Sequence, residues 1–163
     1  MKNKVPLTGI SSVALHAAGH KNAEDAHLTP IFATSTFTFD STEEGMERFA
    51  SKDKTRVYSR WGNPTFTAAE KTIEALEAFG LKNKSGEPLE LRALLHASGQ
   101  AAMTTLFMSE LKGGDAVLSH YSLYGGTHEL LHKVVAAMGV TVIIVDMRDA
   151  IAVENALATN THI

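Results

Sequence analysis

The fold is decided by residues 93–119, which read ALLHASGQAAMTTLFMSELKGGDAVLS. An apolar run over 93–97 is followed by a break at Ser98-Gly99, an apolar helical stretch to Lys112 and a second apolar run over 116–119. Two short apolar runs joined by a helix of this length are typical of a β-α-β unit. This stretch therefore predicts two parallel strands connected by a helix.

A second unit of the same kind follows. Apolar residues in steps of three and four between 130 and 138 mark one face of a predicted helix that Gly139 ends, and 140–145 has the composition of a strand. Asp149 is placed to cap a last helix through about Leu157. The strands are almost continuously apolar, as expected when both faces of a parallel sheet are covered. The predicted class is α/β, with a parallel-rich sheet flanked by helices.

The region before this pattern, residues 1–60, is predicted to be an extended N-terminal arm with one short helix. The Thr/Phe-rich run 34–39 lacks helical periodicity, whereas Ser41 and Glu44 have the spacing of a capping box that opens a helix over about 42–51. We expect the arm to contact another subunit. Residues 61–163 are then expected to be the first half of a larger domain, because a parallel sheet of about three strands leaves edges and faces uncovered.

The composition excludes several classes of protein. With 163 residues, 44% of them hydrophobic, the chain can bury a sizeable core, and a net charge of −3 provides no basic stripe for nucleic acid. The chain has no cysteine, which excludes disulfides, thiolate metal sites and a thiol nucleophile within it. The N-terminus lacks the apolar core of a signal peptide, and no apolar run approaches the ~20 residues that span a bilayer. We expect a cytoplasmic protein that binds neither nucleic acid nor membrane.

Three stretches carry candidate chemistry. Tyr58-Ser59-Arg60 precedes Asn63-Pro64, an N-cap and first helical residue, so a phenol and a guanidinium lie just before a helix start, which is suited to an anion. A surface turn with an ordinary helix cap explains the same residues. After Pro64 the apolar spacing predicts a helix ending near Gly80, followed by an exposed polar loop over 81–90.

The second stretch is Ser98-Gly99-Gln100, between a predicted strand and a helix. Free backbone N–H groups and the positive end of a helix dipole converge there, at the carboxyl end of a parallel strand, and this arrangement suits a phosphate. An ordinary strand-to-helix turn capped by serine is the alternative. No Gly-rich nucleotide motif is present to name a nucleotide.

The third stretch is Tyr124-Gly125-Gly126-Thr127, at the start of the next predicted helix. The Tyr124 ring can stack on a planar heteroaromatic ligand, since the two glycines remove side chains that would block its approach. A turn formed by the two glycines, with no binding role for the ring, is the competing interpretation.

Together these stretches resemble the trans-sulfuration group of pyridoxal-phosphate enzymes, the cysteine and methionine metabolism family. It includes cystathionine γ-synthase, cystathionine γ-lyase, methionine γ-lyase and O-acetylhomoserine sulfhydrylase. The agreement of several spaced motifs in family order is more specific than any one of them. The motifs are Thr29-Pro30-Ile31-Phe32, Thr34-Ser35-Thr36-Phe37, Tyr58-Ser59-Arg60, Gly62-Asn63-Pro64-Thr65, Ser98-Gly99, Gly114-Asp115 and Tyr124-Gly125-Gly126-Thr127.

The resemblance implies part of a fold-type I large domain, with pyridoxal 5′-phosphate as cofactor. It implies that Gly99 and Gln100, next to Ser98, bind the cofactor phosphate through backbone N–H groups. Tyr124 is implied to stack on the pyridine ring and to take part in proton transfer with the substrate amine. Tyr58 and Arg60 are implied to reach the phosphate in a neighbouring subunit, so that sites are shared within a homotetramer, a dimer of dimers.

The sequence also departs from the family. The Schiff-base lysine and the aspartate that holds the pyridine nitrogen are expected beyond the end of this chain, and none of its lysines fills the gap. Complete enzymes are expected to be roughly two to three times longer. Gln100 stands where many relatives carry an apolar residue, and the polar segment between Gly80 and Ala93 is longer than usual. Gly126 stands where methionine γ-lyases commonly have cysteine, which favours γ-replacement or cystathionine-type chemistry.

Two histidine pairs at four-residue spacing, His16 with His20 and His128 with His132, suggest a metal site. No third ligand cluster accompanies either pair, and the second pair fits the solvated flank of an amphipathic helix. We therefore predict no metal.

The leading hypothesis is the N-terminal part of a pyridoxal-phosphate enzyme that performs γ-elimination or γ-replacement on amino acids such as O-acetylhomoserine, cystathionine or methionine. Without the lysine, the isolated chain is predicted to be inactive. The alternative is a non-catalytic α/β module that uses the same anion pocket for another phosphorylated ligand.

Overall fold

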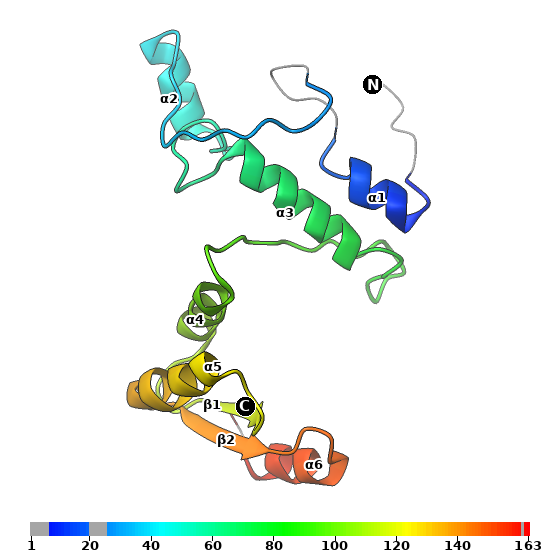
Figure 1. Cartoon of the computed structure of the whole chain (residues 1–163), viewed down its shortest axis with the longest axis vertical. Helices are drawn as coiled ribbons and strands as arrows, with labels where there is room; N and C mark the ends of the chain where they lie inside the picture. Colours follow the sequence, from blue (N-terminus) through cyan, green and yellow to red (C-terminus); the bar gives the residue numbers. More distant parts are fainter. Residues whose placement is uncertain (1–6, 20–25, 161) are drawn as a thin grey trace. The chain divides into compact units, whose positions relative to one another are not determined.

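The computed structural model describes residues 7–19, 26–160 and 162–163. The chain divides into two compact units, residues 1–95 with helices α1 to α3 and residues 96–163 with helices α4 to α6 and both strands (Figure 1). The predicted arm of residues 1–60 is a hypothesis about contact with another subunit, and it stays a prediction.

In the first unit, two predicted helices form at the predicted caps. Helix α2 spans Thr42–Ala50, and the Ser41 hydroxyl accepts a hydrogen bond from the Glu44 N–H at 3.1 Å. Helix α3 spans Pro64–Glu77, where the Asn63 side-chain oxygen accepts from the Thr65 N–H at 2.9 Å. Both starts are therefore fixed by local side-chain chemistry that can be read from the sequence.

The arm also contains a helix that the sequence pattern does not predict. Helix α1 spans Ile10–His16 and packs against α3, with Val13 buried at 5% exposure. It has only seven residues, too few to show a periodic pattern, and a helix this short is stabilised mainly by tertiary packing.

The predicted strand over 93–97 does not form. The N–H of Ala93 donates to the Glu74 carboxylate at 3.0 Å and the N–H of Leu95 donates to the Glu70 carboxylate at 3.1 Å. These carboxylates of α3 take the place of a neighbouring strand as hydrogen-bond partners. Within the described residues the segment pairs with no strand, so apolar composition alone was insufficient for this prediction.

The second unit contains the predicted parallel sheet. Strand β1 spans Ala116–His120 and strand β2 spans Thr141–Val145, and they pair in parallel from Ala116 opposite Thr141 to His120 opposite Val145. The carboxyl ends of both strands thus meet at one edge, where α/β proteins place ligands.

Helices cover both faces of this sheet. The helical stretch after β1 lies on one face and α6 (Ala150–Thr159) on the other (Figure 1). The first stretch consists of α5 (Gly125–Glu129), a π-helical segment η1 (Leu130–Val135) and a 3₁₀ turn η2 (Ala136–Met138). The sequence predicts one regular helix that ends at Gly139, whereas the structure has three successive helical forms; Gly139 ends the stretch as predicted, at φ 85°.

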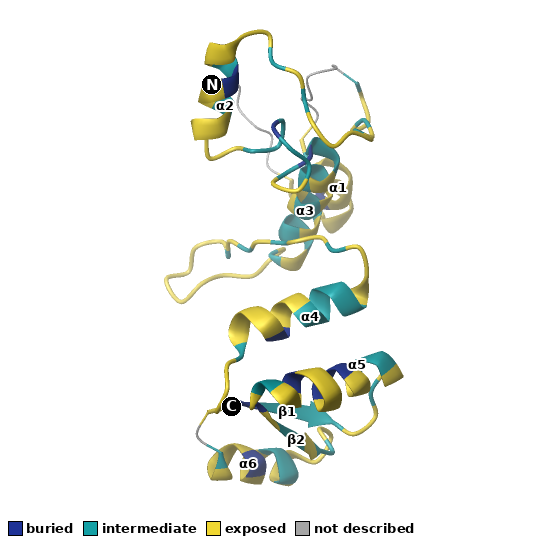
Figure 2. Ribbon diagram, turned by 90° about the vertical axis from the view of Figure 1, so that its left-hand side faces the viewer, coloured by how far each residue is buried: buried dark blue, intermediate teal, exposed yellow. Residues whose placement is uncertain are grey.

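The core lies where this stretch meets the sheet and α4, which spans Gly99–Glu110 (Figure 2). Leu131 and Val135 of η1 are almost fully buried, at 1% and 0% exposure. Helix α4 packs against α5 and η1, so the core fixes the N-terminal ends of α4 and α5 relative to each other. In the described part of the chain, no helix has the length and apolarity required to cross a bilayer.

Candidate cofactor site

The N-terminus of α4 presents unpaired backbone donors. The Ser98 hydroxyl accepts from the Ala101 N–H at 3.1 Å, and the Ser98 carbonyl accepts from the Ala102 N–H at 3.1 Å. The N–H groups of Gly99 and Gln100, which precede the first intrahelical bond, have no hydrogen-bond partner within the described residues. A Cβ at Gly99 would meet nothing within 4 Å, so no side chain packs over the first residue of α4.

Tyr124 begins the next helix through its backbone and leaves its ring free. Its carbonyl accepts from the N–H groups of Thr127 at 2.9 Å and His128 at 3.1 Å, which starts α5. The side chain does not cap the helix and is 74% exposed. The phenol ring is therefore available for a planar ligand.

The structure brings Tyr124 and Gln100 to the same place. The Gln100 side-chain nitrogen donates to the Thr127 hydroxyl at 2.9 Å, which links the first turn of α4 to the first turn of α5. A Cβ at Gly126 would lie 2.7 Å from Cε1 of Tyr124 and 3.4 Å from Cδ of Gln100. The Tyr124 ring thus lies against the bare α-carbon of Gly126. Thr127 was not predictable as a partner from the sequence, because 27 residues separate it from Gln100.

The other predicted pair, Tyr58 and Arg60, lies in the first unit. The Arg60 guanidinium lies over the Tyr58 ring, 5.2 Å from its centroid. Arg60 is exposed and has no hydrogen bond or ion pair with any described residue. A guanidinium stacked on an aromatic face keeps its N–H fork free for an anion.

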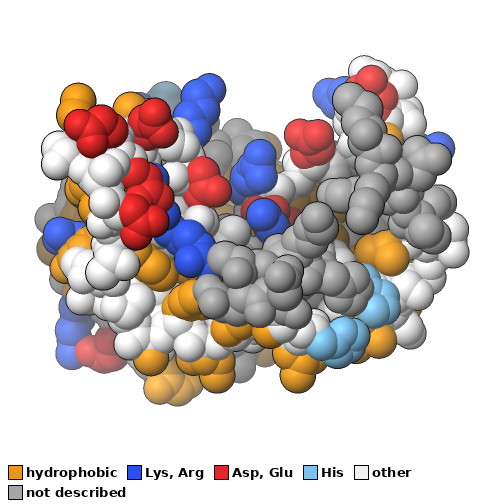
Figure 3. All heavy atoms as spheres, turned by 90° about the horizontal axis from the view of Figure 1, so that it is seen from above, with side chains coloured by type: hydrophobic (Ala, Val, Ile, Leu, Met, Phe, Trp, Pro, Cys, Tyr) orange, Lys and Arg blue, Asp and Glu red, His pale blue; other side chains and the backbone are white. Residues whose placement is uncertain are grey.

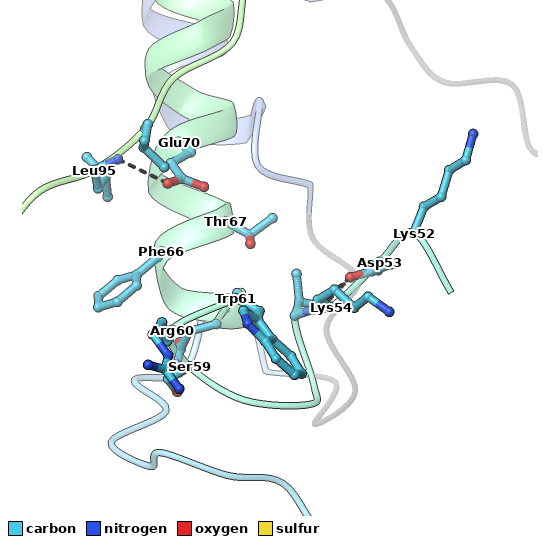
Figure 4. Close-up of a pocket in the computed structure, with 14 residues that line it drawn as sticks. Lys52, Asp53, Lys54, Ser59, Arg60, Trp61, Phe66, Thr67, Glu70 and Leu95 are labelled. Atoms are coloured by element: carbon cyan, nitrogen blue, oxygen red, sulfur yellow. Dashed lines mark hydrogen bonds between the residues drawn. The ribbon is translucent and has the colours of Figure 1, made fainter. Parts of the chain in front are cut away.

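Arg60 lines a pocket of about 420 Å³ at the N-terminal end of α3 (Figure 4). Trp61 and Phe66 supply apolar walls, and Lys52 and Lys54 lie on the loop opposite. The two acidic groups of the lining are already engaged. Asp53 accepts from the Thr55 hydroxyl at 2.7 Å, which holds the pKa of Asp53 below its usual value, and Glu70 accepts from the Leu95 N–H.

Partly buried hydrogen bonds orient the segment that carries Arg60. Asn63, only 3% exposed, donates to the Phe32 carbonyl and to the Ser59 hydroxyl, both at 3.0 Å. The Thr65 hydroxyl donates to the Pro30 carbonyl at 3.1 Å. These bonds join the arm to the motif preceding α3, so two of the sequence motifs form one structural element.

A polar network that sequence reasoning missed lies at the carboxyl edge of the sheet. Arg148 binds both carboxylate oxygens of Asp146, at 3.0 and 2.8 Å, and donates to the Tyr121 hydroxyl at 2.9 Å. The Met147 N–H donates to Nδ1 of His120 at 3.1 Å. The Arg148 side chain and backbone hydrogen bonds hold the pKa of Asp146 below its usual value. The position of these residues just after the two strands was the available signal.

The histidine pairs show no metal geometry in the part of the chain that is described. His128 and His132 are exposed, with ring centroids 4.3 Å apart, and no group of three potential ligands gathers around them. His20 lies outside the described residues. The face shown in Figure 3 carries Lys and Arg side chains intermixed with Asp and Glu.

An α/β unit with two open helical amides beside an exposed tyrosine defines an anion site with an aromatic platform. The model of the family described as Cys/Met metabolism PLP-dependent enzyme matches residues 11–163. The chain belongs to this family, whose cofactor is pyridoxal 5′-phosphate.

Individual relatives agree with this assignment. The chain is 38% identical over 162 residues to an L-methionine gamma-lyase of Treponema denticola, covering 99% of this chain and 38% of that protein. It is 33% identical over 142 residues to the O-acetyl-L-homoserine sulfhydrylase of Corynebacterium glutamicum, covering 86% of this chain and 30% of that protein. The crystal structure of cystathionine gamma-lyase from Lactobacillus plantarum complexed with L-serine matches with a TM-score of 0.69 and 31% identity, over 91% of this chain and 34% of that one.

The chain therefore spans somewhat more than a third of the length of the first of these relatives. The predicted family, cofactor and α/β class are confirmed. The residues present also fit the cofactor: two unpaired N–H groups suit its phosphate, and an exposed ring beside them suits its pyridine.

Proposed function

We propose that this chain supplies the N-terminal portion of a PLP-dependent enzyme that performs γ-elimination or γ-replacement on amino acids such as methionine, cystathionine or O-acylhomoserine. The observation that carries the proposal is that the Tyr124 ring and the side chain of Gln100, whose own N–H is unpaired, lie against the same glycine, Gly126, in a chain of this family. The names of the relatives include both lyases and sulfhydrylases, which supports the reaction class.

Each residue has a distinct task in this proposal. The N–H groups of Gly99 and Gln100 bind the phosphate, and the dipole of the 12-residue helix α4 adds to their attraction. The Ser98 hydroxyl accepts from the Ala101 N–H and keeps its own proton to donate to the same anion. Tyr124 provides the stacking face, and its exposed phenol can exchange a proton with the substrate amine. The bound cofactor supplies an electron sink for carbanion chemistry.

The oligomer is also part of the proposal. Arg60 carries a free guanidinium fork on an exposed turn, which suits a phosphate held by another subunit. We propose on this ground that Tyr58 and Arg60 complete the site of a neighbouring subunit in a homotetramer. A cytoplasmic location stays a prediction.

The test is an assay of the complete gene product, reconstituted with pyridoxal 5′-phosphate. Methionine, cystathionine and O-acetylhomoserine are supplied with and without a thiol, and α-keto acid, ammonia and thioether products are measured. Turnover of a γ-substituted substrate supports the proposal, and the effect of thiol separates replacement from elimination. Cofactor binding without turnover of any of them would favour a non-catalytic binding module instead.

The isolated 163-residue chain is expected to show no turnover, because none of its lysines lies in a setting that suits the Schiff base. Production of an α-keto acid by this chain alone, above a no-protein control with free cofactor, would contradict that expectation.

A further inference from the structure

The side chain of Gln100 has an environment that its backbone role does not explain. Its N–H, with that of Gly99, is one of the two unpaired donors at the N-terminus of α4, whereas its side-chain amide points to α5 and donates to Thr127 at 2.9 Å. The bond is partly buried, and both residues are partly shielded from solvent. One residue therefore touches both the anion position and the helix that carries Tyr124.

The Tyr124 ring depends on this helix for its position. The ring is 74% exposed, and its side chain makes no capping hydrogen bond to α5. What locates it is the backbone of α5, which starts at the Tyr124 carbonyl, and the bare surface of Gly126 against which it lies. The Gln100 amide flanks Gly126 on the same side, 3.4 Å from where a Cβ would be.

We propose that Gln100 is a positioning residue: its side-chain hydrogen bond to Thr127 fixes the first turn of α5, and thereby holds the Tyr124 ring at a set distance from the amides of α4. The inference rests on the proposed function, and it assigns to this side chain a task separate from phosphate binding. A spacing fixed in this way matches a ligand that has an anion and a planar ring joined by a short linker. The backbone amides alone bind any small anion and place no demand on Tyr124.

Two near-isosteric variants of the complete protein isolate the bond: Gln100→Met and Thr127→Val. Each removes one partner and leaves the backbone of both helices intact. The probes are inorganic phosphate, which reports on the amides alone, and pyridoxamine 5′-phosphate, which adds the ring and forms no Schiff base. We expect each variant to lose roughly two- to tenfold in affinity for pyridoxamine 5′-phosphate, the range one neutral hydrogen bond supplies. Affinity for inorganic phosphate is expected to stay within about twofold.

A Tyr124→Leu background separates positioning from a general structural effect. If Gln100 acts through Tyr124, adding Gln100→Met to Tyr124→Leu causes no further loss of pyridoxamine 5′-phosphate affinity. Hydrogen exchange of the apoprotein gives a readout without any ligand. The amides of Thr127 and His128, which bond to the Tyr124 carbonyl, are expected to exchange roughly two- to tenfold faster in both single variants.

The outcomes are distinct. Equal loss of both probes, undiminished pyridoxamine 5′-phosphate affinity, or a full further loss in the Tyr124→Leu background would each overturn the positioning role. Failure of the wild-type complete protein to bind either probe would instead overturn the proposed function, and with it this inference. Unchanged exchange at Thr127 and His128 would show that the bond does not hold the turn of α5.

Discussion

Replacing Gly126 by alanine tests the platform geometry most directly. The new Cβ would lie 2.7 Å from Cε1 of Tyr124, a distance that real contacts do not reach, so the ring has to move. Because the ring is 74% exposed, it can swing into solvent without disrupting the core. Alanine also favours helix over glycine by at most about 1 kcal/mol. The apoprotein is thus expected to change in stability by less than about 1 kcal/mol.

The cofactor is expected to respond differently. An aromatic stacking contact contributes about 0.5–1.5 kcal/mol, so losing it should weaken pyridoxamine 5′-phosphate binding by roughly two- to tenfold. The matched control is Gly125→Ala, one residue earlier in the same helix, where a Cβ meets nothing within 4 Å. Both variants are titrated by fluorescence in the complete apoprotein, and their thermal midpoints are compared.

Equal affinities for the two alanine variants would refute the reasoning, since only one of them displaces Tyr124. A large loss of stability in Gly126→Ala alone would refute it in a different way, by showing that the ring is held in the fold rather than resting on its surface.

Three further predictions concern the rest of the site. Arg60→Ala should weaken cofactor retention in the assembled protein by roughly ten- to a hundredfold, because it removes a charge-assisted hydrogen bond. The cofactor that remains bound after dialysis is measured, and retention equal to wild type would argue against a shared site. Asn63→Ala should lower the free energy of unfolding of the first unit by about 2–3 kcal/mol, measured by denaturant unfolding. The change removes the cap of α3 and leaves the Phe32 carbonyl without its partner. Asn63→Asp should keep part of this stability, because aspartate can still cap the helix. The pKa of Asp146 is lowered in the folded protein, so its ionised form stabilises the fold. This stabilisation is present above the unfolded pKa of about 3.9 and is lost as pH falls through the lower folded value. A difference in unfolding free energy from Asp146→Asn that stays constant between pH 6 and pH 2 would contradict this.

The elements that were predictable from the sequence have local determinants. Helices α2, α3 and α6 start at Ser41, Asn63 and Asp149, each of which accepts a hydrogen bond from the first turn as its residue type predicts. The parallel strands were predictable from nearly continuous apolar runs bounded by glycine and polar residues. The segment 93–97 is similarly apolar but forms no strand, because two of its N–H groups donate to carboxylates of α3. These contacts are tertiary and cannot be read from the local sequence.

The candidate site likewise contains residues that the sequence identifies and contacts that it does not. Ser98, Gly99 and Gln100 were identifiable as candidates because a helix start leaves N–H groups unpaired, and Tyr124 because the two glycines after it leave its ring accessible. The structure links these two helix starts through the Gln100 side chain. The Gln100–Thr127 bond and the Arg148–Tyr121 bond each span 27 residues, and neither follows from local pattern. The π-helical form of Leu130–Val135 was equally hidden, since its apolar spacing fits an ordinary helix at this length.

The side chain of Asn63 connects two parts of the chain: the segment that ends at Phe32 and the turn that carries Arg60. Its partners are a carbonyl 31 positions earlier and a hydroxyl four positions earlier, so amino acids inserted or deleted between positions 32 and 63 have to be absorbed in the loops between them. A homologue shortened at its beginning past Phe32 would keep the helix that follows but lose one of the two hydrogen-bond partners of Asn63. The arginine before that helix would then be oriented only through the bonds of Ser59, to Asn63 and to the backbone at residues 34 and 35, so the direction of its guanidinium would be less firmly fixed.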